Sequence, residues 1–124
     1  MDEKFRKQLE ENGADVDATL KRFMGNETLY MKFIMKFLDD KNFAGVKENL
    51  GKKDYEAAYV SAHTLKGVTA NLGLDPVYKV VSQISDMLKG KSPEEVDHEK
   101  LKELSGQLEV EYSRFIRILE ENKP

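Results

Sequence analysis

Apolar residues recur at intervals of three and four along nearly the whole chain, the pattern of α-helices that each bury one face. The most regular stripe lies in the middle of the chain and consists of Tyr55, Ala58, Ala62, Leu65, Thr69 and Leu72. Such a three–four alternation is typical of the buried seam of a bundle helix. No segment of useful length alternates apolar and polar residues as a β-strand would. The pattern therefore predicts an all-α protein.

Capping residues and glycines divide this pattern into separate helices, which we expect over residues 16–24, 26–50, 54–73, 75–90 and 92–119. Asn26 and Asp54 have side chains that cap helix N-termini, and Pro76 suits the first turn of a helix. Ser92 and Glu95 have the spacing of a capping box, in which each side chain satisfies the other's backbone N–H.

Short connections between long helices make successive helices antiparallel. We therefore predict an antiparallel up-down-up-down four-helix bundle with an additional short N-terminal helix. The second predicted helix is long, and we expect it to kink near residues 39–42. A chain of 124 residues suits one domain. We expect a charged N-terminal segment over residues 1–14, a single bundle domain over 15–121 and a tail over 122–124.

Composition excludes several classes of function. The chain has 20 Lys and Arg against 23 Asp and Glu, and it has no basic stripe, so we do not expect it to bind nucleic acid. It has no cysteine, which excludes a disulfide, a thiol nucleophile and a thiolate metal site. It opens on charged residues and contains no apolar run of membrane-spanning length. We expect a cytoplasmic protein that does not bind membranes.

The chain contains two histidines, and they lie in different settings. His98 follows an acidic, polar stretch, and we interpret it as a solvated surface residue. His63 lies in the middle of a helix, about 100° around the axis from the buried seam. Tyr59, Lys66 and Gly67 are its neighbours on that side of the helix.

Gly67 is the unusual member of this group, because glycine inside a helix costs about 1 kcal/mol relative to alanine. This cost is tolerated where another backbone, a ligand or a partner must approach closely. A lone histidine on a helix is more often a half-buried residue with one hydrogen bond. That interpretation does not explain why Lys66 and Gly67 follow one turn later on the same face.

The sequence around His63 resembles a known family. Residues 63–73 read HTLKGVTANLG and are similar to the motif of histidine phosphotransfer (HPt) domains, which is H-x-L-K-G followed by small residues and L-G. Residues 20–30 read LKRFMGNETLY and resemble an earlier segment of the same family, with the pattern apolar-R-F-x-G-[DN]-E-x-L-[YF]. The resemblance covers the chain from about Val16 to Leu119.

The resemblance implies that His63 accepts a phosphoryl group from the aspartyl phosphate of a receiver domain and passes it to another receiver in a phosphorelay. Lys66 would offset charge on the phosphoryl oxygens, and Gly67 would leave room for them and for the partner's loops. Ser85, or else Ser82, on the next helix would orient His63, although relatives often have a longer polar residue at that position. The resemblance implies no cofactor on this chain, because Mg²⁺ belongs to the receiver.

The same resemblance implies a docking surface for receiver domains of response regulators and hybrid sensor kinases. We expect this surface to combine the first helix with the exposed flanks of the two helices after it, of which the second carries His63. The candidate contact residues are Val16, Leu20, Met24, Tyr59 and Ala70. Such encounters are transient and their interfaces are small. The polar outer faces of the helices favour a monomer.

Four other functions are alternatives to this one. A di-metal carboxylate centre needs Glu-x-x-His on two helices, but Glu95 and His98 supply it once and Val60 precedes His63 at that spacing. The chain has no phosphate-binding loop for ATP, so we expect a phosphoryl carrier rather than an enzyme. Two alternatives within the family stay open: a bundle used only for interaction, and a chemotaxis-type kinase domain phosphorylated in trans by an ATP-binding catalytic domain.

Overall fold

The computed structural model describes residues 1–124, and all of its regular secondary structure is helical, as the sequence predicts. The elements are α1 (Glu3–Glu11), α2 (Val16–Arg22), α3 (Glu27–Lys36), the 3-10 helix η1 (Phe37–Asp39), α4 (Asn42–Gly51), α5 (Tyr55–Leu72), α6 (Asp75–Leu88), the 3-10 helix η2 (Pro93–Glu95) and α7 (His98–Glu121). None of these helices combines the length and the apolar character needed to cross a membrane.

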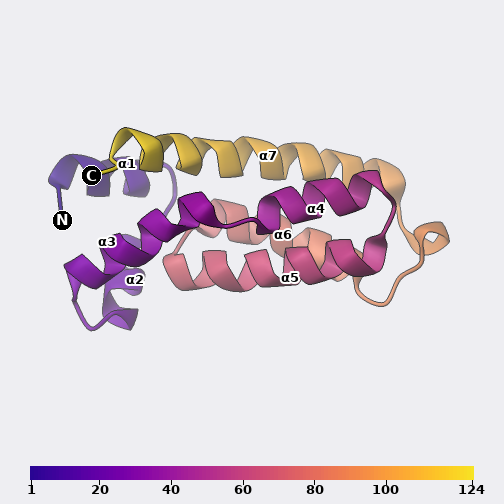
Figure 1. Cartoon of the computed structure of the whole chain (residues 1–124), viewed down its shortest axis with the longest axis horizontal. Helices are drawn as coiled ribbons and strands as arrows, with labels where there is room; N and C mark the ends of the chain where they lie inside the picture. The colour runs from indigo at the N-terminus through magenta and orange to yellow at the C-terminus, as the bar shows by residue number, and fades with distance from the viewer.

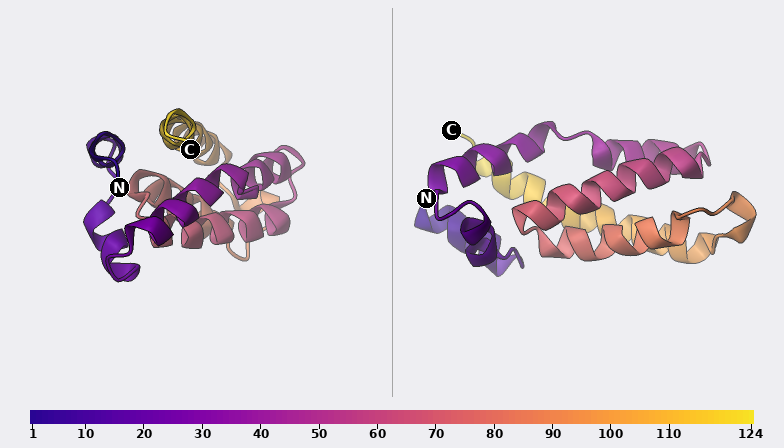
Figure 2. Two further views of the ribbon diagram at one scale, coloured as in Figure 1. Left: turned by 60° about the vertical axis from the view of Figure 1, so that its left-hand side comes forward. Right: turned by 90° about the horizontal axis from the view of Figure 1, so that it is seen from below.

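Helices α4 to α7 lie side by side along the long axis of the molecule (Figures 1 and 2). Helix α5 packs against both α4 and α6, and α6 packs in turn against α7. Helices α1 and α2 lie at one end of this bundle, together with both chain termini. The core runs through all of these helices as one cluster of buried apolar side chains.

The predicted seam and caps of the central helices are confirmed. All six residues of the predicted seam on α5 are buried, and Ala58, Ala62 and Leu65 are completely so. The side chain of Asn26 accepts a hydrogen bond from the backbone N–H of Leu29 at the start of α3. Asp54 caps α5 in the same way.

The expected kink near residues 39–42 is a complete break between two helices. Helix α3 tightens into η1, and the backbone then becomes extended at Asp40 before α4 begins. The carboxylate of Asp40 accepts hydrogen bonds from both the backbone and the side chain of Asn42. These bonds fix the angle at which the chain enters α4.

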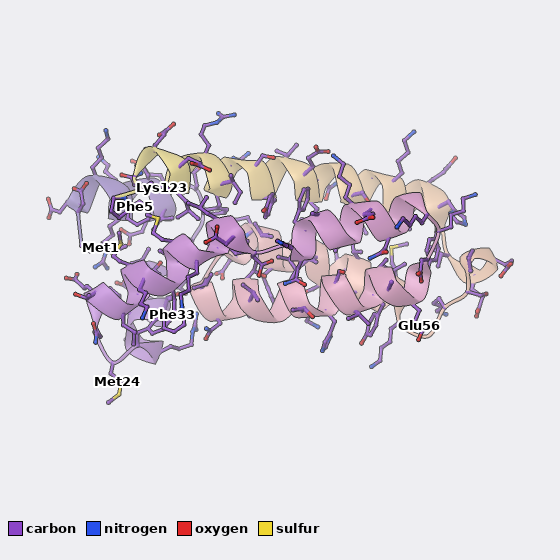
Figure 3. All side chains as sticks on the ribbon, in the orientation of Figure 1. Met1, Phe5, Met24, Phe33, Glu56 and Lys123 are labelled. Carbon is purple, nitrogen blue, oxygen red and sulfur yellow. The ribbon has the colours of Figure 1, made fainter.

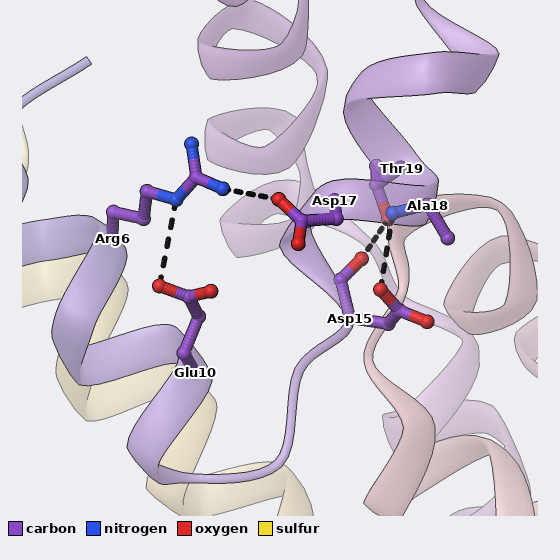
Figure 4. A network of polar contacts seen from close by, with 6 residues as sticks. All are labelled: Arg6, Glu10, Asp15, Asp17, Ala18 and Thr19. Atoms are coloured by element: carbon purple, nitrogen blue, oxygen red, sulfur yellow. Dashed lines mark hydrogen bonds and ion pairs between the residues drawn. The ribbon is translucent and has the colours of Figure 1, made fainter.

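The N-terminal segment corrects the sequence prediction. Residues 1–14 were expected to be a charged segment outside the bundle domain, but they contain α1, whose Phe5 and Leu9 are 1 % and 0 % exposed. These two side chains are one helical turn apart and enter the same core as the rest of the bundle. Arg6 of α1 forms ion pairs with Glu10 and with Asp17 of α2 (Figure 4). The bundle therefore includes the residues that a boundary at 15 leaves out.

The start of the last helix is also corrected. Ser92 and Glu95 form the expected capping box, but it encloses the single turn of η2. The buried residue Val96 has extended backbone angles and ends that turn. Helix α7 begins anew at His98, with Asp97 as its N-cap.

Helix α2 is anchored on the tight turn between α5 and α6. The turn residue Gly73 has φ +71°, in the left-handed region that favours glycine, and its carbonyl accepts a hydrogen bond of 2.8 Å from the N–H of Asp15. A Cβ at Gly73 would lie 2.6 Å from the carbonyl oxygen of Asp15 and would collide with the Thr19 hydroxyl. Helix α2 ends at Arg22, before the expected end at Met24.

We predict that Gly73→Ala lowers the free energy of unfolding by about 2 kcal/mol or more. The left-handed backbone conformation costs an L-residue about 1–2 kcal/mol, and the new methyl group must also displace α2. Urea denaturation followed by circular dichroism measures the change. Gly51→Ala is the matched control, because a Cβ there meets nothing within 4 Å and the φ of Gly51 is not positive. Equal stability of the two variants would contradict the anchoring role of Gly73.

Candidate functional site

His63 lies in the middle of α5 with its side chain exposed to solvent. The imidazole takes part in none of the hydrogen bonds of the structure, since the only histidine that does so is His98. Its ring stacks instead on the ring of Tyr59, with 5.6 Å between the ring centroids and 25° between the ring planes. Neither ring nitrogen of His63 is therefore occupied by a hydrogen-bond partner within the chain.

The next turn of α5 presents a cation and a gap beside this imidazole. Lys66 is half-buried and forms no ion pair, so its ammonium group is not committed to a carboxylate of this chain. Gly67 and Ala70 are exposed on the same side of the helix. Residues three, four and seven positions apart share one helix face, so the three positions lie beside and beyond His63.

Gly67 has no packing role in the structure. A Cβ placed there would meet nothing within 4 Å, so the glycine is not required by a neighbouring helix. Gly45 of α4 is different, because a Cβ there would lie 3.2 Å from the Cβ of Ser61 on α5 and still closer to its hydroxyl oxygen. Close packing between α4 and α5 thus explains why residue 45 is a glycine. No packing contact explains why residue 67 is one, given the free energy that glycine costs inside a helix.

The two serines expected to orient His63 lie on α6 without reaching it. Ser85 is 2 % exposed, and neither Ser82 nor Ser85 forms a hydrogen bond with His63. The hydroxyl oxygen of Ser82 is buried and has no hydrogen-bond partner at all. In this structure, no side chain of α6 orients the imidazole.

The candidate docking residues of α2 have very different environments. Val16 is 1 % exposed and belongs to the core, so the expectation that it meets a partner is corrected. Leu20 is half-buried against the core. Met24 is 94 % exposed and points away from the bundle (Figure 3).

On α5, Tyr59 is half-buried and Ala70 is exposed, and the structure adds Val60 to them. Val60 is 59 % exposed and lies three residues before His63, on the neighbouring part of the helix surface. The sequence-based candidates on this helix were Tyr59 and Ala70 and did not include Val60. An apolar residue outside the buried stripe was the available signal.

Arg22 is a further residue whose role the sequence did not reveal. Its guanidinium group donates hydrogen bonds to the carbonyl oxygens of Ala70 and Asn71, at 2.9 and 3.2 Å. The last carbonyls of a helix have no partner within the helix and carry partial negative charge, so a cation stabilises them. Arg22 thereby fixes the end of α2 against the end of α5.

His98 is exposed, as expected, and both of its ring nitrogens also form hydrogen bonds. Its Nε2 lies 2.7 Å from the carbonyl oxygen of Pro93, and its Nδ1 lies 3.0 Å from the hydroxyl of Tyr55. The bond to Tyr55 ties the start of α7 to the start of α5, and the bond to Pro93 ties it to η2. Glu95 belongs to η2 while His98 begins α7, so the Glu-x-x-His spacing does not lie on one helix.

Comparison with known proteins identifies one family. A family model described as the Hpt domain matches residues 37–116, which contain all of α4, α5 and α6 and most of α7. His63, Lys66 and Gly67 lie inside this range. Searches of curated proteins and of solved structures found no match.

We predict that Gly67→Ala raises the free energy of unfolding by up to about 1 kcal/mol, because alanine is the better helix former and its methyl group meets no neighbour. Gly106→Ala on α7 is a matched control, since a Cβ there also meets nothing within 4 Å. Urea denaturation of both variants measures the gain. Destabilisation by Gly67→Ala alone would show that Gly67 has a packing role after all.

Proposed function

The chain belongs to the Hpt domain family, whose members take part in histidine phosphotransfer in two-component phosphorelays, and we propose that it carries the phosphoryl group on His63. In this proposal His63 receives the group from the aspartyl phosphate of one receiver domain and gives it to another. The observation that carries the proposal is the exposed imidazole of His63, free of hydrogen bonds, in the family-matched helix beside an unpaired lysine.

The proposed reaction needs an unprotonated ring nitrogen at its start. The lone pair of that nitrogen attacks phosphorus, the bond between phosphorus and the aspartyl oxygen breaks, and the aspartate leaves as a carboxylate with both electrons. The return reaction transfers the group from nitrogen to the aspartate of the next receiver. Phosphoryl transfer passes through a loose transition state, so its rate depends mainly on positioning and on neutralising charge.

Lys66 supplies the charge that this chain contributes to the reaction. Its ammonium group forms no ion pair within the protein, so no carboxylate competes with the phosphoryl oxygens for it. A charge-assisted hydrogen bond from an ammonium group to a phosphoryl oxygen is shorter and stronger than a neutral one. The open space over Gly67 leaves room for these oxygens and for the partner's loops.

The receiver supplies the rest of the site in this proposal, namely its acidic pocket, its Mg²⁺ ion and its lysine. The chain has no cofactor and no ATP site of its own and acts as a phosphoryl carrier. Its docking surface combines Leu20 and Met24 near the end of α2 with Tyr59, Val60 and Ala70 on α5. The scaffold is an up-down-up-down bundle, and we propose that the protein acts as a monomer in the cytoplasm.

We predict that His63→Gln abolishes phosphoryl transfer, because glutamine has no nucleophilic ring nitrogen, while the melting temperature stays nearly unchanged. The chain is incubated with a phosphorylated receiver domain, and the acid-labile phosphate that it acquires measures transfer. His98→Gln serves as the matched control at the only other histidine and should still be labelled. Equal labelling of His63→Gln and wild type would overturn the assignment. Parallel incubation with an ATP-loaded histidine-kinase catalytic domain separates the kinase-domain alternative from the relay.

We predict that a large residue at Gly67 slows transfer between His63 and a receiver by about tenfold or more, because misplacement of reacting atoms by about 1 Å can cost two orders of magnitude. Gly67→Leu tests this, with Gly106→Leu as the control for helix stability. The rate of label transfer at saturating receiver is the measurement. Unchanged transfer by a folded Gly67→Leu variant would contradict the idea that the receiver needs this space.

A further inference from the structure

We propose that Tyr59 is the positioning residue for His63, holding the imidazole by ring stacking so that one ring face is covered and the other opens over Gly67. The proposal rests on the phosphoryl-carrier function of His63. It assigns to Tyr59 a role in the reaction itself, in addition to the contact with a partner that its location suggests.

The geometry of a helix brings the two rings together. Side chains on an α-helix tilt toward its N-terminus, so each residue leans over the residue four positions earlier. His63 accordingly leans over Tyr59, and the rings stack with 5.6 Å between centroids and 25° between planes. The residue that would lean over His63 from the other side is Gly67, which has no side chain.

Tyr59 is anchored, whereas His63 is not. The ring of Tyr59 is half-buried and packs against the hydrophobic core, so its position follows that of the backbone of α5. The imidazole is exposed, and among hydrogen bonds, ion pairs and ring stacks its contact with Tyr59 is the only one it makes. Ser82 and Ser85 of α6, the two side chains expected to orient it, form no hydrogen bond with it.

Because Tyr59 is anchored and His63 is not, the stack determines from which side the phosphoryl group can approach the imidazole. An unrestrained histidine on an exposed helix face samples several side-chain rotamers, whereas transfer requires the attacking nitrogen and phosphorus to meet in line at about 3–3.5 Å. Stacking on Tyr59 restricts the plane of the ring and covers one of its faces. The phosphoryl group and the partner then approach from the side of Gly67, where a Cβ would meet nothing within 4 Å.

The ring of Tyr59 performs this role, and its hydroxyl group takes no part in it. No hydrogen bond in the structure involves the Tyr59 hydroxyl, so phenylalanine keeps the stack and leucine removes it. The test uses Tyr59→Phe and Tyr59→Leu in the full chain, with Tyr59→Met in case the leucine variant is not folded. Phe33→Leu is the matched control, because it removes a stacked ring, 5.5 Å from that of Phe23, on α3.

Two phosphoryl donors separate positioning from docking. Phosphoramidate is a small molecule with no docking surface, and a phosphorylated receiver domain uses the whole surface. We expect wild type, Tyr59→Phe and Phe33→Leu to react alike with phosphoramidate. The leucine and methionine variants should react about two- to tenfold more slowly with both donors, which is the range expected for the loss of one aromatic pair. A loss confined to the receiver reaction would overturn the proposal, because it would mark Tyr59 as a contact residue only.

An NMR measurement tests the stack without any reaction. The ring protons of His63 should be shifted upfield by the ring current of Tyr59 in wild type and in Tyr59→Phe, and should return toward random-coil positions in Tyr59→Leu. Identical shifts in all three proteins would overturn the proposal. Failure of wild type to exchange phosphoryl groups with any receiver would overturn the relay function instead, and the ring shifts and phosphoramidate rates would still decide the role of Tyr59.

Discussion

The burial of one face of α5 between its neighbours is the constraint on which the rest of the structure depends. Ala58 and Ala62 are small and completely buried, and Gly45 allows the backbone of α4 to approach Ser61 closely. Interiors packed in this way resist movement, so the backbone of α5 is fixed on both flanks. The backbone of a residue about 100° from the buried line, such as His63, is then held at a defined place on the exposed face, and the ring stack with Tyr59 adds to this.

The anchoring of α2 completes this constraint at the end of the helix. The bond from Asp15 to the Gly73 carbonyl and the bonds from Arg22 to the last carbonyls of α5 join α2 to the turn that leads into α6. Helix termini leave carbonyl groups without partners, and here a neighbouring helix satisfies two of them. The exposed residues near the end of α2, Met24 above all, are thereby held near the same end of α5.

The sequence could predict those features that depend only on residues close together in the chain. The seam of α5, the caps at Asn26 and Asp54 and the shared face of His63, Lys66 and Gly67 follow from helical periodicity, which needs no knowledge of the fold. Helix α1 was missed because its only buried residues, Phe5 and Leu9, stand among charged residues and gain their burial from other helices.

The other features that the sequence did not reveal include contacts between segments distant in the sequence. Val16 is buried because α2 lies across the end of the bundle, and His98 is constrained because the start of α5 places Tyr55 beside it. The stack of Tyr59 on His63 is local, since the two are one turn apart. The spacing of the two residues shows that their side chains can meet. It does not show that the ring of Tyr59 packs against the core, which is what allows Tyr59 to hold the imidazole.

In the proposed transfer the chain supplies the nucleophile but only part of the positive charge that the reaction needs. The imidazole proposed as the nucleophile stacks on Tyr59, and Lys66 is the one unpaired ammonium group beside it, whereas the charge of a phosphoryl group is spread over three oxygens. In the proposed reaction most of the charge neutralisation therefore comes from the partner, which is consistent with release of the phosphoryl group to the next receiver. A carrier that stabilised the phosphoryl group strongly would retain it, so a fixed ring with few charged neighbours suits reversible transfer. The proposal also gives a physical reason for the exposed Gly67, because charges of the partner act strongly only within contact distance of the group that they stabilise.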